Sequence, residues 1–227
     1  MYALVTYALA RGLEMLPAGQ AYLFGGVCAL ALFASVVAHE FAHALVARRF
    51  GVRTSAITLF LFGGVATLDE EPPTPRAEAW IALAGPALSA LLAVAAFGLM
   101  ALVERTVPGR SGIALGLLGA YLALANGVLA VFNLVPAYPM DGGRVLRALL
   151  WHLRRDRLSA TAISARIAIG FALALVAAGV LCAMATRNAI YAWYVVLGVF
   201  LLRQGWTEER ATHAPAPGGE SGVPAAA

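Results

Sequence analysis

The sequence predicts an all-α polytopic membrane protein with about six transmembrane segments and a small re-entrant β-hairpin. The chain of 227 residues is 61% hydrophobic and only 12% charged, and its mean hydropathy is +0.81. Such a composition leaves too few polar side chains to cover a soluble globule. The apolar residues also form long uncharged runs, close to the roughly 20 residues that a helix needs to cross a bilayer. One further apolar segment is too short to cross and indicates the hairpin.

Five runs are predicted to span the membrane, and a sixth segment is incomplete. The last run is short, but Arg187 and Arg203 can extend from its ends to the lipid headgroups. The segment before the first run contains Arg11 and Glu14, so we expect it to form at most a partial or interfacial span. In chain order the five runs are residues 20–47, 79–103, 111–140, 167–186 and 188–202.

The segment between the first two runs has the pattern of paired strands. Residues 55–68 read SAITLFLFGGVATL, in which two β-prone runs flank Gly63-Gly64. A two-residue Gly-Gly link is typical of a hairpin with a primed turn. Its apolar content favours a hairpin embedded in the membrane over a soluble loop. The acidic, proline-rich residues 69–75 then return the chain to water.

The carboxy-terminal part of the chain differs in composition from the membrane region. Beyond Gln204 the chain becomes polar and then rich in Ala, Pro and Gly, which cannot bury enough surface to fold. We therefore predict a transmembrane domain over residues 1–206 and a disordered cytoplasmic tail over residues 207–227. No internal repeat is convincing, so the catalytic unit is expected to be the whole transmembrane domain.

Basic residues predict the orientation of the chain in a cell membrane. All of them are Arg, and they are concentrated near residues 48–53 and 144–157. The positive-inside rule assigns both clusters to the cytoplasmic side. Guanidinium groups in these positions suit lipid headgroups, and the composition argues against a nucleic-acid partner. It predicts no particular oligomeric state.

The motif His39-Glu40-Phe41-Ala42-His43 lies inside the first apolar run. On a helix, residues four apart project from one face, so His39 and His43 can offer two imidazoles to one zinc ion. Glu40 is then placed to take a proton from a water molecule activated by that ion. A chance match on an ordinary helix is the alternative. It is weakened by the membrane setting, where a charge at mid-bilayer costs about 2.5 to 3.5 kcal/mol.

A hydrolytic zinc site usually has three protein ligands, so this motif lacks one. Asp141 is the candidate, because it comes after a long uncharged run in the element Asn133-Leu-Val-Pro-Ala-Tyr-Pro-Met-Asp-Gly-Gly-Arg144. Pro136 and Pro139 end the helix there, and the glycines after Asp141 allow close backbone approach. The alternative is that Asp141 belongs to an ordinary cytoplasmic turn, in which Asp-Gly pairs are common.

With these motifs the chain resembles the site-2 protease family of intramembrane zinc metalloproteases. The resemblance covers about residues 21–151. Neither a PDZ-like insertion nor CBS domains are recognised in this sequence, which affects the expected regulation but not the expected catalysis. Besides the histidine motif, the matching elements are Ala47-Arg48-Arg49-Phe50-Gly51, Phe62-Gly63-Gly64-Val65-Ala66, Ala84-Gly85-Pro86 and the element that ends in Asp-Gly-Gly-Arg.

The resemblance implies a role for each matched residue. It implies cleavage of peptide bonds in or near the transmembrane segment of single-span membrane proteins, with one zinc ion per chain. The ion would lie toward the cytoplasmic leaflet, about 14 Å along the helix from Arg48. Gly63 and Gly64 match the family's re-entrant hairpin, which we expect to bind substrate. His39, His43 and Asp141 then correspond to the zinc ligands, Glu40 to the general base, and Asn133 to a group that holds substrate or the developing oxyanion.

Three other functions are alternatives. The GxSG pattern at residues 109–112 is that of a rhomboid serine protease, but Ser111 and the nearest spare histidine, His152, are predicted on opposite sides of the membrane. A prenyl-protein protease would normally take its third ligand from a Glu on a downstream helix, which this sequence lacks. A membrane metal transporter or sensor using the same ligands remains open, although it would leave Glu40 without a role.

Overall fold

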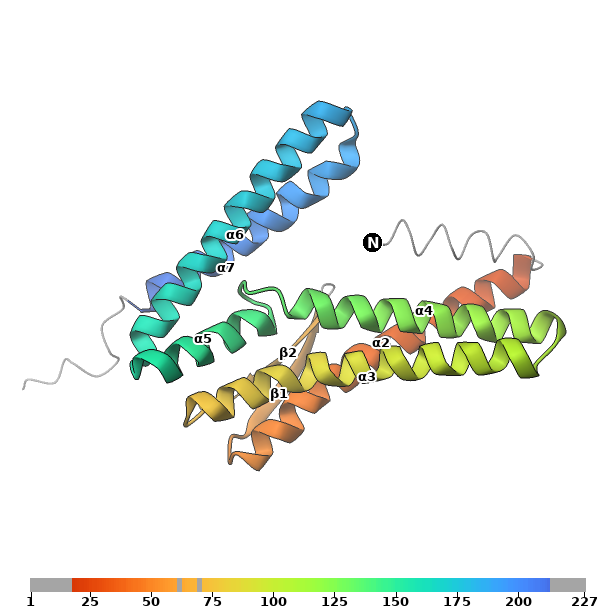
Figure 1. Ribbon diagram of the computed structural model, residues 1–227, viewed down its shortest axis with the longest axis horizontal. Coiled ribbons are helices and arrows are strands. Elements are labelled where there is room, and N and C mark those ends of the chain that lie inside the picture. Colours follow the sequence, from red (N-terminus) through yellow and green to blue (C-terminus); the bar gives the residue numbers. More distant parts are fainter. Residues whose placement is uncertain (1–17, 61–62, 69–70, 213–227) are drawn as a thin grey trace, which may run out of the picture. The chain divides into compact units, whose positions relative to one another are not determined.

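The structure is a computed structural model that describes residues 18–60, 63–68 and 71–212 (Figure 1). Nearly all of the described chain is helical. The elements in chain order are α2 (Ala18–Arg49), β1 (Thr54–Phe60), β2 (Gly63–Leu68), α3 (Pro75–Thr106), α4 (Gly109–Asn133), α5 (Asp141–Arg154), α6 (Arg157–Thr186), the 3-10 turn η1 (Ala189–Tyr191) and α7 (Ala192–Ala211).

Five of the described helical segments are long and apolar enough to cross a membrane, which confirms the five predicted spans. The third span ends at Asn133, earlier than the uncharged run, because the prolines after it cannot continue the helix. The partial sixth segment, residues 1–16, lies outside the described residues. The five spans are Leu23–Arg49, Pro75–Thr106, Ser111–Asn133, Arg157–Thr186 and Ala189–Arg210.

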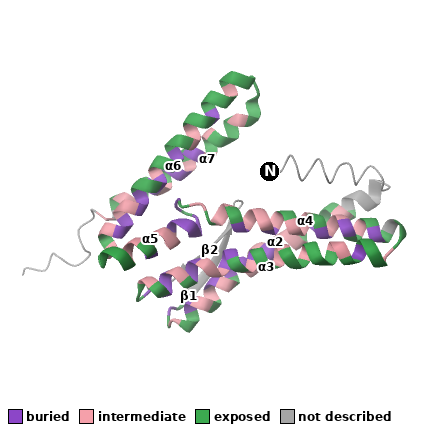
Figure 2. Ribbon diagram, in the orientation of Figure 1, coloured by how far each residue is buried: buried purple, intermediate pink, exposed green. Residues whose placement is uncertain are grey.

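Burial has the pattern of a protein that meets lipid (Figure 2). Small residues such as Ala82, Ala165 and Ala172 are buried between helices, whereas large apolar side chains such as Leu30 and Phe97 face outward. A water-soluble protein places most such side chains inside. Close packing of small residues is how membrane helices associate, because lipid tails are as apolar as leucine. The chain is therefore a multi-pass membrane protein.

The described residues divide into two compact units. The first contains α2, β1, β2, α3, α4 and the start of α5 up to Val145. Within it α2 packs against α3 and α4, and both strands contact α2. α3 begins where Thr74 caps it: the Thr74 hydroxyl oxygen accepts a hydrogen bond from the Ala77 backbone N–H at 3.1 Å, and Pro75 occupies the first turn.

The second unit contains residues 136–139 and the chain from Leu146 onward. Its main feature is the pairing of α6 with α7. Asp156 caps α6 by accepting hydrogen bonds from the backbone N–H groups of Leu158 and Ser159. α7 continues to Ala211, beyond the predicted domain boundary at residue 206. The prediction of a disordered tail from residue 207 onward is therefore wrong for residues 207–211. These residues continue the helix of the last span. The rest of the predicted tail, residues 213–227, lies outside the described residues.

β1 and β2 pair antiparallel in one two-stranded sheet. Phe60 is opposite Gly63 and Leu59 is opposite Gly64, so both glycines lie within β2. The prediction that they form the link between the strands is wrong. A glycine can take its place in a β-ladder, and the β-prone residues after them extend the strand back to Gly63. Residues 61–62, between the two paired strands in the sequence, lie outside the described residues.

Candidate metal centre

His39 and His43 lie on the buried face of α2, one turn apart. Their Nε2 atoms each lie 3.2 Å from Oδ2 of Asp141. The exposed fractions of His39, His43 and Asp141 are 2%, 3% and 8%. One ligand atom from each side chain lies within 4.8 Å of the others. In the part of the chain that the structure describes, this is the group of His, Cys, Asp or Glu side chains that could share one ion.

Asp141 reaches the two histidines because of how α4 and α5 join. α5 begins at Asp141, and the carboxylate is favoured there by the partial positive charge of the helix N-terminus. Gly142 is next, and a Cβ on it would overlap the backbone carbonyl oxygens of Leu134 and Val135. The prediction that a glycine after Asp141 permits close backbone approach is thus confirmed. Only glycine allows the start of α5 to lie this close to the end of α4.

Asp141 is held in its ionised form. Burial by itself raises the pKa of the Asp141 carboxyl, but hydrogen bonds from His39 and His43 and their charge outweigh burial and lower the pKa to about 2. The carboxylate therefore persists at neutral pH. An ionised carboxylate between two imidazoles is a donor set that suits zinc.

The other ring nitrogen of each histidine is held by α3. Nδ1 of His43 donates a hydrogen bond to the backbone carbonyl of Ile81 at 2.6 Å, and Nδ1 of His39 lies 2.9 Å from the hydroxyl of Ser89. Both contacts are buried. Such contacts fix which nitrogen of an imidazole is free to bind a metal. Sequence reasoning missed Ile81 and Ser89, because one contributes a backbone atom and the other is an ordinary serine in an apolar helix.

Gly85 makes room for the two imidazoles. A Cβ added at this position would overlap Nε2 of both His39 and His43. Pro86 is the next residue of the same helix, is buried, and has no backbone N–H to donate to the preceding turn. The Ala84-Gly85-Pro86 element, noted in the sequence only as part of a resemblance, thus forms the wall of the site.

The other residues predicted from the sequence to take part in the site lie on α2, α4 and β2. Glu40 directly follows His39 on α2 and is buried, with an exposed fraction of 6%. Asn133 is half-buried at the end of α4, and its Nδ2 donates to the carbonyl of Leu129 at 2.9 Å. Its amide is therefore engaged with its own helix. Gly63 and Gly64 lie in β2, a strand that contacts α2.

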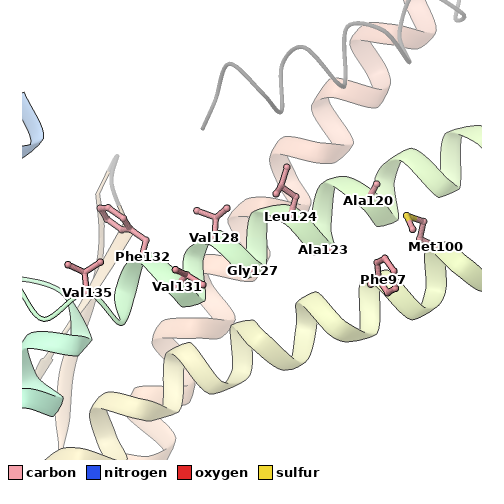
Figure 3. Close-up of a pocket in the computed structure, with 10 residues that line it drawn as sticks. All are labelled: Phe97, Met100, Ala120, Ala123, Leu124, Gly127, Val128, Val131, Phe132 and Val135. Atoms are coloured by element: carbon pink, nitrogen blue, oxygen red, sulfur yellow. The ribbon is translucent and has the colours of Figure 1, made fainter. Parts of the chain in front are cut away.

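A groove on the first unit is lined by none of the three cluster residues. It runs between α3 and α4, has a volume of about 800 Å³, and extends along α4 as far as Val135 (Figure 3). All of its lining residues, among them Phe97, Met100 and Leu124, are apolar or glycine. It offers no group that could bind a metal or transfer a proton, so the candidate chemistry belongs to the histidine cluster.

The chain is similar to proteins of one peptidase family. The model of peptidase family M50 matches residues 27–115 and 109–177. The chain is 37% identical over 210 residues to a candidate zinc metalloprotease of Synechocystis sp., covering 91% of this chain and 54% of that protein. It is 36% identical over 159 residues to a zinc metalloprotease of Methanocaldococcus jannaschii, covering 70% of this chain and 44% of that one.

A solved structure is also similar. It is the site-2 protease from Methanocaldococcus jannaschii, which matches with a TM-score of 0.58 and 31% sequence identity. The match covers 92% of this chain and 88% of the other. By contrast, the chain spans about half the length of the curated relatives that it matches.

Proposed function

The chain belongs to peptidase family M50, and from this we propose that it is an intramembrane zinc metalloprotease. It would hydrolyse peptide bonds in or near the transmembrane segment of single-span membrane proteins. The observation that carries the proposal is a buried cluster of two imidazoles and one carboxylate inside apolar helices, with a further carboxylate, that of Glu40, beside it. Buried ionisable groups in a membrane segment indicate function, because they are costly to keep there.

The donor set fits one zinc ion per chain. Two imidazoles and a carboxylate leave a fourth position for water or substrate, as in other catalytic zinc sites. The Nδ1 contact of His43 leaves Nε2 as the nitrogen that would bind a metal next to Asp141, and the absence of a side chain at Gly85 lets both rings take up their positions. A bound zinc ion would lower the pKa of a water molecule and polarise the scissile carbonyl.

Within this site we assign Glu40 as the general base. Its carboxylate would accept one proton from the attacking water as the oxygen bonds to the carbonyl carbon. It would then deliver that proton to the amide nitrogen as the C–N bond breaks, so that one water is consumed for each peptide bond. Asn133 would hold substrate or the developing oxyanion through its amide group, which requires it to release Leu129. A transporter or sensor would give Glu40 no comparable role.

The zinc site is tested by metal content. We expect the purified protein to hold about one equivalent of zinc, and His43→Ala to lose it, because two ligands bind the ion far more weakly than three. His152→Ala is the matched control, since His152 lies on the exposed face of α5. Elemental analysis of protein in detergent gives the answer. A His43→Ala protein that is folded and still carries the full zinc content would exclude the site.

We further propose that β1 and β2 form a re-entrant hairpin that binds substrate by strand addition. A helical substrate hides its peptide bonds in backbone hydrogen bonds and must unwind before attack. In lipid, each unpaired backbone group costs several kcal/mol. An outer edge of the two-stranded sheet, which contacts α2, would pair with the extended backbone. Gly63 and Gly64 would allow that backbone to approach closely.

A proline scan of β1 tests strand addition. Leu59→Pro should reduce cleavage strongly and leave the zinc content unchanged, because proline removes a backbone donor from the strand but touches no metal ligand. Helix-breaking residues in the substrate should partly restore cleavage, since they lower the cost of unwinding. If prolines throughout residues 57–60 left cleavage unchanged, the strands would have another role.

The site is proposed to lie toward the cytoplasmic leaflet. Arg48 and Arg49 form the last turn of α2 and are exposed. Side chains of this kind mark the cytoplasmic boundary of a span. The histidines precede them by only one to three turns of the same helix, which keeps the cluster on that side of the bilayer.

A further inference from the structure

α3 meets the two histidines with three residues at a matching spacing. Ile81, Gly85 and Ser89 are four residues apart and therefore share one face of α3. His43 contacts Ile81 and His39 contacts Ser89, while Gly85 lies against both rings. The three residues of α3 are thus spaced four apart, as the two histidines of α2 are, so that each histidine ring meets its own partner on α3.

The two contacts differ in what they permit. A backbone carbonyl can only accept, so Nδ1 of His43 carries a hydrogen, and in the neutral ring the lone pair that can bind a metal is on Nε2. A hydroxyl can donate or accept, so the contact between His39 and Ser89 is compatible with either tautomer. No change of side chain at Ile81 removes its carbonyl. The contact with Ser89 is therefore the one of these two contacts that a side-chain substitution can remove.

The backbone of α2 is held independently of this contact. One turn before His39, the hydroxyl of Ser35 accepts a hydrogen bond from Nδ2 of Asn126 at 3.1 Å, across the interface with α4. This pair is buried and fixes the position of the helix, not the orientation of the His39 ring. The His39 ring is held by Asp141 at Nε2 and by Ser89 at Nδ1, and Ser89 is fully buried, so bulk water cannot replace its hydroxyl.

We propose that Ser89 is a positioning residue for the metal site. Its hydroxyl accepts the Nδ1–H of His39 and so directs the Nε2 lone pair of His39 toward Asp141, where zinc would bind. This inference rests on the proposed zinc site. Partners of this kind typically change metal affinity or activity by roughly 10- to 100-fold when they are removed.

The test is the zinc affinity of the metal-free protein, measured by competition with a chelator of known affinity. Ser89→Ala should raise the zinc dissociation constant roughly 10- to 100-fold. Ser89→Thr, which keeps a hydroxyl, should restore affinity, and Ser89→Cys, a weaker acceptor of similar shape, should fall between. Thr161→Ala is the matched control: Thr161 is buried and its hydroxyl donates to the carbonyl of Arg157 in its own helix, so its loss should leave the dissociation constant unchanged.

Two further measurements separate positioning from a purely structural role. At saturating zinc, Ser89→Ala should lower kcat and leave KM nearly unchanged, and the melting temperature of the metal-free protein should stay close to wild type. The inference is overturned if Ser89→Ala binds zinc as tightly as wild type, or if a lower melting temperature accompanies weak binding in Ser89→Ala, Ser89→Cys and Ser89→Thr alike. A wild-type protein that binds no zinc would instead overturn the proposed function.

Discussion

Glu40→Gln is expected to keep zinc and to lose peptide hydrolysis. The amide is nearly the same size as the carboxylate, so the buried position beside His39 should accept it. It cannot take a proton from water, and general bases typically contribute about 10²- to 10⁴-fold to a rate. We therefore expect cleavage of a single-span substrate in proteoliposomes to fall by about 10²- to 10⁴-fold, with zinc content unchanged by elemental analysis.

Glu104→Gln is the control for this substitution, because Glu104 is an exposed acid at the far end of α3. It should cleave at the wild-type rate. The same pair of variants distinguishes a protease from a metal transporter. Zinc flux into liposomes that survives Glu40→Gln would favour transport, and cleavage at the wild-type rate by that variant would exclude the proposed mechanism.

The membrane spans and the residues brought together at the centre could be predicted from the sequence because both signals are local. A span is a run of apolar residues, and the two histidines share a helix face through their spacing alone. Asp141 could be predicted because an acid at the end of a long uncharged run stands out against its surroundings. Residues of these types are unusual in an apolar sequence and can be recognised without a structure. The structure brings His39, His43 and Asp141 together.

The contribution of α3 could not be predicted in the same way. Ile81 acts through its backbone, and Gly85 acts through the side chain that it lacks. Neither has a residue type that indicates metal chemistry, and their contacts with α2 depend on how two distant helices pack. The link between β1 and β2 was misplaced for a related reason, since Gly63 and Gly64 are compatible with both a turn and a strand.

Gly85→Ala is expected to abolish zinc binding without unfolding the protein. Glycine inside a helix is less favourable than alanine by about 0.5–1 kcal/mol, so by propensity alone the change should stabilise α3. The added methyl group, however, would overlap Nε2 of both His39 and His43. The rings can turn away, because their far ends are side-chain atoms and not backbone. Turning them removes both imidazole ligands from Asp141, and hydrolysis should be lost together with zinc.

The loss of zinc should exceed any loss of stability. The metal-free Gly85→Ala protein should still unfold cooperatively but at a lower temperature than wild type, because turning the rings breaks their contacts with Asp141. Zinc titration should show binding at least about 100-fold weaker, the upper end of what the loss of a supporting contact causes. Gly98→Ala is the matched control, since Gly98 lies in the same helix and a Cβ there meets no atom within 4 Å. It should keep full zinc affinity. Full zinc affinity in Gly85→Ala would contradict the proposed site, because in the observed arrangement that methyl group overlaps Nε2 of both rings.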